Sequence, residues 1–345
     1  MEEDNMVREL KISGKTGNSR IMVGEALKNL GLHLPKGKTV IITDETVNDL
    51  YGNLFPACPV LEIGEGEGNK TLDTVARLMG ELVGLGLDRS CFIVGIGGGI
   101  VCDVTGFVAS TYLRGVDFGF CPTTLLAQVD ASVGGKNGVN YKGYKNMVGV
   151  FNQPSFVLCD PKVLKSLPQD ELTNGFAEIV KHGAIRDESH FTFLEDNKAK
   201  ALSLDSEFMA HLIYDSIAIK ADVVNQDEKE TGIRKILNFG HTFGHALEKT
   251  AGVSHGKAVS AGMVMACNLS MDRGLLKESD SERIKKLLKD LGLPLRIEVD
   301  PAKALDALAK DKKKLGDAIQ FVLLKALGEA VVETISIRDL ETNLG

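Results

Sequence analysis

The chain has 345 residues, of which 43% are hydrophobic, and a formal net charge of −7. A chain of this length and apolar content is large enough for two domains, each with its own hydrophobic core. The acidic balance leaves no broad basic surface and argues against a nucleic-acid backbone or an anionic membrane as the main partner. We therefore expect a protein that binds small molecules.

The cysteines and the N-terminal residues predict a cytoplasmic location. The six cysteines are scattered without a Cys-x-x-Cys pair and mostly lie in apolar runs, as buried thiols do in a reducing compartment. The opening residues MEEDNMVREL are acidic and polar, unlike a secretory signal. No apolar run approaches the roughly 18 residues that a membrane span needs.

The first half alternates short β-branched runs with helical stretches. Residues 70–87 place Leu72, Val75 and Leu78 at helical spacing, as in the crossover helix of a βαβ unit. This alternation predicts a mostly parallel, Rossmann-like sheet. An early hairpin is predicted at 11–24, and the predicted strands cover residues 39–47, 91–99, 118–124 and 155–160.

After about Leu167 the periodicity becomes helical, followed by one late strand at 319–327. We therefore predict an α/β fold: an α/β domain over residues 1–166 and a mainly α-helical domain over residues 167–345. Ser279 and Glu282 fit a capping box, and Gly292 followed by Pro294 is a helix stop. The predicted helices cover residues 207–224, 242–252, 256–276 and 281–293.

A glycine run, GIGGGIVCD at 95–103, follows a predicted strand and begins a predicted helix. Such a turn suits a nucleotide pyrophosphate, because uncapped amides and the helix dipole attract phosphate. A tight strand-to-helix turn is the competing interpretation, since the spacing is not Gly-x-Gly-x-x-Gly. Asp44 at a strand end similarly suits either a ribose hydroxyl or a helix N-cap.

Residues 114–149 concentrate polar side chains and glycines beside a strand end, and we interpret them as a loop built around a ligand. Each of the cations Arg114, Lys136, Lys142 and Lys145 taken alone is more often a solvated surface residue. The cluster of Asp130, Gly134, Gly135, Lys136 and Asn146 favours recognition of an anionic, polyhydroxylated small molecule, because glycine is costly unless the backbone must turn or come close to another group.

One carboxylate and several histidines in the second half could hold a metal. Glu178 and Lys181 lie one helical turn apart in an apolar setting and could simply pair with each other. The stretch LNFGHTFGHALE adds His241 and His245 on one helix face, and His255 follows. A carboxylate and two imidazoles suit zinc or a similar divalent ion. The spacing alone leaves open whether His241 and His245 are paired ligands.

Several long blocks together resemble the 3-dehydroquinate synthase family. These blocks include RGVDFGFCPTTLLAQVDASVGGKNGVN, KNMVGVFNQPSFVLCD, NGFAEIVKHG and DEKETGIRKILNFGHTFGHALE. The resemblance runs from about residue 40 to 330 and implies conversion of 3-deoxy-D-arabino-heptulosonate 7-phosphate to 3-dehydroquinate and phosphate in the shikimate pathway. It implies transient oxidation by NAD, phosphate elimination, re-reduction and intramolecular aldol closure. It further implies that residues 1–166 form an NAD-binding α/β domain and that residues 167–345 form a helical metal- and substrate-binding domain. One divalent metal (Zn or Co), a homodimer and lyase chemistry are also implied.

The resemblance also assigns roles to residues. It implies that Glu178, His241 and His255 are the metal ligands and that His245 faces the substrate, with His245, Lys181, Asn146 and Lys136 catalytic. The implied substrate-binding residues are Arg114, Asp130, Lys136, Lys145, Asn146, Lys181, Lys220, Arg234, Asn238, His245 and Lys312. The implied cofactor-binding residues are Asp44, Glu67, Lys70, Gly98, Gly99, Asp103, Thr123, Thr124, Lys136, Lys145 and Ser166.

Two departures and three alternatives remain open. The chain differs from the family pattern around Ser166, where residues 163–168 read VLKSLP. Lys312 and Lys313 are adjacent and are equivalent candidates for the substrate-binding lysine. A sugar phosphate cyclase of the 2-deoxy-scyllo-inosose synthase type is one alternative, although Arg234 and Asn238 favour a carboxylated substrate. A metal-dependent polyol dehydrogenase and a non-catalytic sensor of nucleotide or sugar phosphate are the others.

Overall fold

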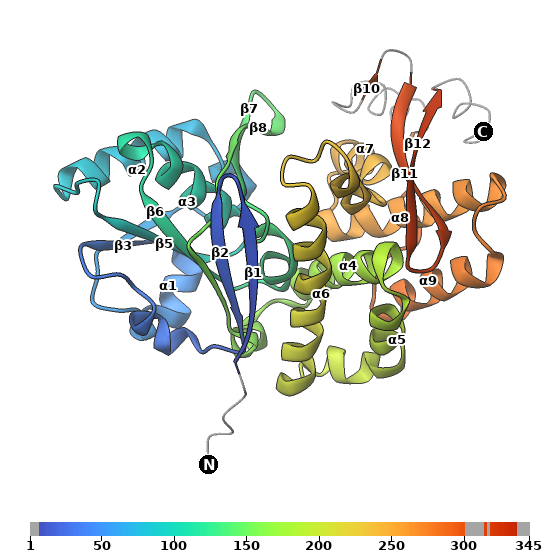
Figure 1. The fold of residues 1–345 in the computed structure, drawn as a ribbon, viewed down its shortest axis with the longest axis horizontal. Helices are drawn as coiled ribbons and strands as arrows, with labels where there is room; N and C mark the ends of the chain where they lie inside the picture. Colours follow the sequence, from blue (N-terminus) through green and yellow to red (C-terminus); the bar gives the residue numbers. More distant parts are fainter. Residues whose placement is uncertain (1–6, 301–313, 316–317, 337–345) are drawn as a thin grey trace. The chain divides into compact units, whose positions relative to one another are not determined.

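The computed structural model describes residues 7–300, 314–315 and 318–336. The chain folds into two compact units: Met1–Leu167 with Ser206–Lys229, and Pro168–Asp205 with Glu230–Gly345. The sequence-based division at 166/167 leaves 206–229 in the second domain. In the structure α6 (Ser206–Gln226) belongs to the first unit, because it packs against β1 and β2 (Figure 1).

The first unit is built on a seven-stranded sheet in the order β1-β2-β9-β6-β5-β3-β4. All neighbouring strands are parallel except β1 and β2, which form the hairpin predicted from the sequence. The mostly parallel α/β sheet is therefore confirmed, although β4 was not predicted. The strands are β1 (Arg8–Gly14), β2 (Gly17–Val23), β3 (Thr39–Asp44), β4 (Val60–Ile63), β5 (Phe92–Gly97), β6 (Asp117–Pro122) and β9 (Phe156–Cys159).

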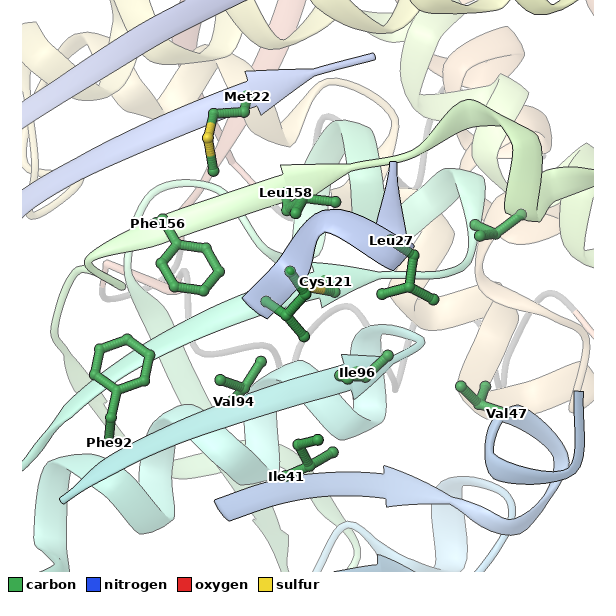
Figure 2. Close-up of a cluster of buried hydrophobic side chains, with 12 residues drawn as sticks. Met22, Leu27, Ile41, Val47, Phe92, Val94, Ile96, Cys121, Phe156 and Leu158 are labelled. Atoms are coloured by element: carbon green, nitrogen blue, oxygen red, sulfur yellow. The ribbon is translucent and has the colours of Figure 1, made fainter. Parts of the chain in front are cut away.

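A buried apolar cluster covers one face of this sheet (Figure 2). Phe92 of β5 and Phe156 of β9 stack with their ring centroids 5.7 Å apart, and Ile41 of β3 lies in the same cluster. Because β-branched and aromatic side chains pack well on a pleated surface, these strands form the core. Helix α3 packs against β5, β6 and β3. The helices are α1 (Glu45–Tyr51), α2 (Leu72–Gly84) and α3 (Gly99–Thr111).

Residues 114–149 are not a loop alone. Besides β6, which matches the predicted strand at 118–124, they contain a π-helical turn over Ala127–Ala131 and most of an antiparallel hairpin of β7 (Lys136–Tyr141) and β8 (Tyr144–Phe151). The hairpin exposes Tyr144 and Met147, so it shows little of the alternation between buried apolar and exposed polar residues that marks a strand. This explains why the sequence did not predict it.

The second unit is mainly helical, as predicted. Helices α7 and α8 pack closely, and Gly262 leaves the space for this approach. A Cβ on Gly262 would lie 2.1 Å from the carbonyl oxygen of Gly240. Phe243 and Phe321 meet at a centroid distance of 5.0 Å and join α7 to β11. The helices are α4 (Gln169–Arg186), α5 (Glu188–Leu202), α7 (His241–Ala251), α8 (His255–Asp272) and α9 (Glu278–Asp290), and the strands are β10 (Lys314–Leu315), β11 (Ala318–Ala326) and β12 (Glu329–Ser336).

The predicted capping box at Ser279 and Glu282 is wrong. Helix α9 begins at Glu278 with Lys277 as its N-cap, and the amide of Asp280 donates to the carbonyl oxygen of Lys277. Ser279 therefore lies inside the first turn and cannot cap it. The predicted stop is confirmed, since Gly292 with φ +79° follows the C-cap Leu291. No helix of the described residues is long and apolar enough to cross a membrane.

Candidate functional site

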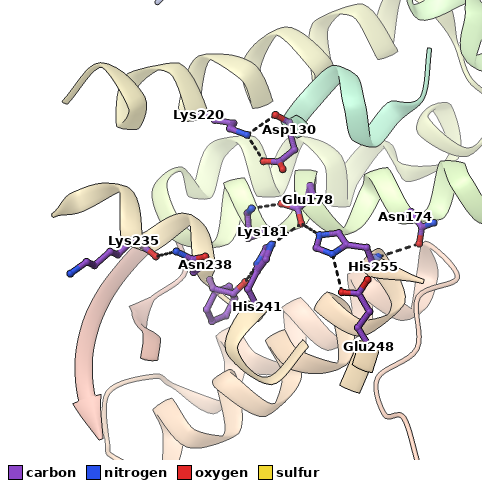
Figure 3. A network of polar contacts seen from close by, with 12 residues as sticks. Asp130, Asn174, Glu178, Lys181, Lys220, Lys235, Asn238, His241, Glu248 and His255 are labelled. Atoms are coloured by element: carbon purple, nitrogen blue, oxygen red, sulfur yellow. Dashed lines mark hydrogen bonds and ion pairs between the residues drawn. The ribbon is translucent and has the colours of Figure 1, made fainter. Parts of the chain in front are cut away.

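Three side chains of the second unit converge on a common point (Figure 3). Glu178 lies in the middle of α4, whereas His241 and His255 are the first residues of α7 and α8. Oε1 of Glu178 lies 3.5 Å from Nε2 of His241 and 3.3 Å from Nε2 of His255. Ligands at about 2.0–2.1 Å from a tetrahedral zinc ion are separated by about 3.3–3.4 Å. These separations therefore suit a shared divalent cation.

The same carboxylate is paired with a buried lysine. Nζ of Lys181 contacts Oε2 of Glu178 one helical turn away, and the two side chains are 1% and 0% exposed. Burial lowers the pKa of His255, but Glu178 and Glu248 outweigh it and raise that pKa to about 9. The arrangement thus gathers one buried anion, one buried cation and two imidazoles. The pairing of Glu178 with Lys181 does not compete with a cation, because it uses the other carboxylate oxygen.

Residues that sequence analysis missed hold the two histidines. The carbonyl oxygen of Phe239 lies 3.2 Å from Nδ1 of His241, which favours the tautomer whose Nε2 carries the lone pair. Oδ1 of Asn174 accepts hydrogen bonds from Oγ of Ser254 at 2.7 Å and from the amide of Gly256 at 3.2 Å. These two residues flank His255.

Glu248 lies on the other side of the same imidazole, with Oε2 3.7 Å from Nδ1 of His255. Asn174 precedes Glu178 by one helical turn, and Glu248 follows His241 by two. A search for polar residues at helical spacing from the predicted ligands would have found both. The contacts themselves join separate helices and leave no local pattern in the sequence.

His245 differs from the other two histidines. It is exposed, its ring centroid lies 5.5 Å from that of His241, and it is not part of the group of possible ligands formed by Glu178, His241 and His255. An exposed imidazole one helical turn from a candidate metal can exchange a proton with a bound molecule. The geometry therefore separates the two histidines of the GHTFGH stretch.

Arg234 and Asn238 lie in the 3-10 helix η7 (Ile233–Asn238) of the second unit. Arg234 is 1% exposed, so it is a buried cation and not a solvated surface residue. Nδ2 of Asn238 donates to the carboxylate of Glu230 and to the carbonyl oxygen of Lys235. Glu230, which has φ +60°, was not singled out from the sequence, although it lies four residues before Arg234.

In the first unit the structure brings Lys220 and Asp130 together. Nζ of Lys220 donates at 2.6 Å both to Oδ1 and to the carbonyl oxygen of Asp130, which lies in the π-helical turn, a feature that often occurs at functional sites. Figure 3 includes this pair. The predicted Lys312 lies outside the described residues.

The remaining substrate candidates of this unit are exposed. They belong to the hairpin of β7 and β8 or to the turn after α3, and two of them have a left-handed backbone, with φ +71° at Arg114 and +50° at Asn146. A left-handed backbone is uncommon in residues other than glycine, and where it occurs it often marks a functional site. The exposed candidates are Arg114, Lys136, Lys145 and Asn146.

The cofactor candidates gather at the carboxyl ends of the parallel strands. Asp44 ends β3, Gly98 and Gly99 follow β5, and Thr123 and Thr124 follow β6. The chain order reverses between β3 and β5, and such a switch point is where open α/β sheets bind nucleotides. Gly98 caps α3 without a side chain, so the first amides of that helix face no capping group.

Other cofactor candidates are already engaged in the first unit. Nζ of Lys70 lies 2.5 Å from Oδ2 of Asp103, and burial raises the pKa of Asp103 although Lys70 lowers it. Oε1 of Glu67 accepts from Nδ2 of Asn140 at 2.7 Å.

Asp44 accepts from the amide of Val47 at 2.8 Å as N-cap of α1, and Oγ of Ser166 lies 2.6 Å from the hydroxyl of Tyr51. Asp44 can therefore cap α1 and also accept from a ribose hydroxyl, since the cap uses one carboxylate oxygen.

Comparison with known families matches both units of the chain. Residues 60–174 match the model of the 3-dehydroquinate synthase N-terminal region, and residues 175–314 match that of the 3-dehydroquinate synthase C-terminal region. A 3-dehydroquinate synthase of Desulforamulus reducens is 43% identical over 320 residues, which cover 88% of this chain and 89% of that protein. This likeness extends over nearly the whole length of both proteins.

Two solved structures share the fold at lower identity. The 2-epi-5-epi-valiolone synthase of Streptomyces hygroscopicus subsp. jinggangensis 5008, with NAD+ and Zn2+ bound, is 26% identical with a TM-score of 0.87 and covers 98% of each chain. A 2-deoxy-scyllo-inosose synthase complexed with carbaglucose-6-phosphate, NAD+ and Co2+ is 27% identical with a TM-score of 0.83 and covers 98% of this chain and 99% of its own.

Proposed function

The chain belongs to the 3-dehydroquinate synthase family, and from this premise we propose how its residues perform the reaction. The enzyme converts 3-deoxy-D-arabino-heptulosonate 7-phosphate to 3-dehydroquinate and phosphate. The observation that carries the site assignment is the convergence of Glu178, His241 and His255. The lyase classification, as a carbon–oxygen lyase that eliminates phosphate, is part of the proposal.

Glu178, His241 and His255 hold one divalent ion, zinc or cobalt. Their donor set is a carboxylate oxygen and two Nε2 atoms, the separations from the carboxylate oxygen are 3.5 and 3.3 Å, and three protein ligands leave positions open for substrate. The solved cyclases with Zn2+ or Co2+ support this choice of metals. The metal supplies Lewis acidity when bound.

NAD binds at the carboxyl ends of β3, β5 and β6. Gly98 and Gly99 at the start of α3 receive the pyrophosphate, and Asp44 accepts from ribose hydroxyls. Glu67, Lys70 and Asp103 also contact the cofactor. Thr123, Thr124, Lys136, Lys145 and Ser166 complete the proposed set. The bound cofactor supplies reversible oxidation of the substrate, so the reaction consumes no NAD overall.

The substrate carries two separated anions, and two groups of donors suit them. Arg234, Asn238, Lys136 and Lys220 bind the carboxylate and hydroxyl groups, whereas Arg114, Lys145, Asn146 and Lys312 bind the phosphate. Arg234 suits a carboxylate because a planar guanidinium can bind one bidentately.

Proton movement is assigned to His245 and Lys181. His245 is exposed and can donate to or accept from a substrate hydroxyl. Lys181 holds Glu178 through its second oxygen and provides a donor beside the metal. Asp130 positions Lys220, and Lys136 and Asn146 complete the catalytic set.

A cyclase of the 2-deoxy-scyllo-inosose synthase type is the second candidate, since a solved structure of such an enzyme shares the fold. Sequence identity favours 3-dehydroquinate synthase, because the relatives with that activity are 40–43% identical and the 2-deoxy-scyllo-inosose synthases are 27% identical. A glycerol dehydrogenase structure at 17% identity shares the fold alone.

Two further predictions belong to the same proposal. A homodimer is expected from the family resemblance. A cytoplasmic location is supported by the six cysteines, all of which carry unpaired thiols. The predicted division into an NAD-binding domain and a metal- and substrate-binding domain also remains a proposal about function.

The experiment that tests the function follows phosphate release from the heptulosonate phosphate while absorbance at 340 nm reports NADH. Phosphate release without accumulation of NADH supports the proposal. Stoichiometric NADH would indicate a polyol dehydrogenase, and turnover of glucose 6-phosphate instead would indicate the second cyclase. Absence of any turnover by the metal- and NAD-loaded protein would favour a sensor.

A further inference from the structure

The hairpin of β7 and β8 has a bulge beside Asn140. The two strands pair at Val139 with Val148 and at Tyr141 with Tyr144, and the register shifts between these pairs. Three residues of β8 therefore lie opposite the single residue Asn140 of β7. A bulge of this kind bends the strand and changes the direction of its side chains, and bulges are common beside active sites.

Asn140 uses both ends of its side-chain amide at this bulge. Nδ2 donates to Oε1 of Glu67 at 2.7 Å, and Oδ1 accepts from the backbone amide of Asn146 at 2.9 Å. The two partners fix the orientation of the side chain, because a carboxylate only accepts and a backbone N–H only donates. Asn146 has a left-handed backbone with φ +50°. Asn140 therefore holds Asn146 in a conformation that residues other than glycine rarely adopt.

The backbone of Asn140 contacts the same segment as its Nδ2 atom. Its amide donates to the carbonyl oxygen of Lys70 at 2.8 Å, and Asn140 forms an isolated parallel bridge with Thr71. Thr71 is the N-cap of α2 and accepts from the amide of Thr74 at 3.2 Å. The segment 67–71 is thus continuous with α2, and Asn140 attaches the hairpin to it with two hydrogen bonds.

These contacts join residues that the proposed function assigns to two ligands. Glu67 and Lys70 belong to the proposed cofactor set, Asn146 belongs to the phosphate-binding set, and Lys145 belongs to both. Nζ of Lys145 lies 3.9 Å from Oε1 of Glu67, the oxygen that also accepts from Asn140. All of these residues lie in the first unit. Asn140 therefore connects the cofactor segment 67–71 to the part of the hairpin that carries the phosphate-binding side chains.

We propose that Asn140 is a positioning residue for the substrate phosphate: it holds Lys145 and Asn146 at a fixed place beside the cofactor segment 67–71. This inference rests on the phosphate role proposed for Lys145 and Asn146, and Asn140 acts through these two residues. The position suits asparagine, because a side-chain amide offers a donor to Glu67 and an acceptor to Asn146 at the same time.

The test uses the full-length, metal-loaded enzyme at saturating NAD+. Asn140→Ala removes both side-chain hydrogen bonds. We compare kcat, KM of the heptulosonate phosphate, the inhibition constant of inorganic phosphate, and the inhibition constant of the same heptulosonate without its phosphate, with metal content and Tm as checks on folding. Asn48→Ala is the matched control on α1, because Nδ2 of Asn48 also donates to a glutamate, at 2.7 Å from Oε1 of Glu62.

We expect Asn140→Ala to raise KM of the heptulosonate phosphate and the inhibition constant of inorganic phosphate by about tenfold, the usual effect of a lost hydrogen bond that leaves its partner unsatisfied. The inhibition constant of the heptulosonate without phosphate should not change, because Lys145 and Asn146 hold the phosphate. Asn48→Ala should behave as wild type.

A second pair of variants tests the contact with Glu67. Asn140→Asp keeps the acceptor for the amide of Asn146 but turns a carboxylate toward Glu67, so it should also raise both phosphate-dependent constants. Adding Glu67→Gln restores the hydrogen bond with the donor on the other side and restores the net charge. The double variant should therefore lie closer to wild type than Asn140→Asp alone.

The inference is wrong if folded Asn140→Ala has a lower Tm but unchanged phosphate-dependent constants, since Asn140 would then be structural only. It is also wrong if binding of the heptulosonate without phosphate weakens equally, or if Glu67→Gln brings no recovery. Lys145→Ala, measured alongside, separates the two levels. An effect of Lys145→Ala without an effect of Asn140→Ala overturns this inference alone. No effect of Lys145→Ala on inhibition by phosphate overturns the phosphate role of Lys145, and this inference with it.

Discussion

Glu178 on α4 and His255 at the start of α8 face each other, with Oε1 3.3 Å from Nε2. A contact between Asn174 and Gly256 brings the two helices together: a Cβ on Gly256 would lie 2.4 Å from Cα of Asn174. The close approach of α4 and α8 thus places two candidate ligands that are 77 residues apart in the sequence at a spacing that suits a metal ion.

The first prediction concerns the metal ligands. Alanine at Glu178, His241 or His255 should reduce bound zinc or cobalt from one ion per chain to a small fraction, because two remaining ligands bind weakly. Elemental analysis after dialysis measures this without reference to activity. His245→Ala is the control and should keep its metal while losing kcat. Full metal content in all three ligand variants would disprove the site.

The second prediction concerns Asn174. Asn174→Ala removes the acceptor for Ser254 and Gly256 and should weaken metal affinity by about 10- to 100-fold, the usual effect of residues that orient a ligand. Competition with a chromophoric chelator measures the affinity. Asp170→Asn is the matched control on the same helix, since Asp170 is exposed and pairs with Lys257. Equal affinities in both variants would show that Asn174 does not orient His255.

The third prediction concerns the cofactor. NAD+ should be required but not consumed, because hydride removed from the substrate is returned to it. Titration of NAD-free enzyme with substoichiometric NAD+ should give many turnovers of phosphate per cofactor. One phosphate per NAD+ added would contradict the redox-neutral cycle.

The fourth prediction concerns Arg234. Arg234→Lys should reduce kcat/KM by about 1.5–3 kcal/mol, the range for a hydrogen bond to a charged group, because a lysine cannot bind a carboxylate bidentately. Metal content should stay intact. The comparison is a substrate analogue without the carboxylate, on which the substitution should have little effect. An equal loss on both substrates would remove the carboxylate role.

The fifth prediction concerns pH. Burial raises the pKa of Glu228, but the hydrogen bonds from Thr16, Gln153 and Lys15 outweigh it and hold that pKa in the folded protein below the ordinary value of 4.5. The resulting stabilisation is present above that value and is lost as the pH falls through the folded pKa. The difference in Tm between wild type and Glu228→Gln should therefore be largest near neutral pH and should shrink below about pH 4. Thermal melts of both proteins from pH 3 to 7 measure it. A difference that does not depend on pH would mean that the charge of Glu228 contributes nothing.

Local patterns in the sequence predicted much of the fold. β-branched runs at 39–47 and 91–99 correspond to β3 and β5, and helical spacing predicted α2, α6, α7, α8 and α9. A pairing of Glu178 and Lys181 was one possibility that the sequence left open, because residues three apart share a helix face. The family resemblance assigned His255 to the metal and His245 to the substrate, a division that the spacing alone left open.

Tertiary structure decided what depends on contacts between distant segments. The attachment of α6 to β1, the binding of Glu228 by the amide of Lys15, and the support of His255 by Asn174 each join residues far apart in the chain. Periodicity reports only which face of an element is buried, not which element covers it. The exposed hairpin of β7 and β8 was missed for a related reason, because a strand pair that buries little apolar surface leaves little alternation in the sequence.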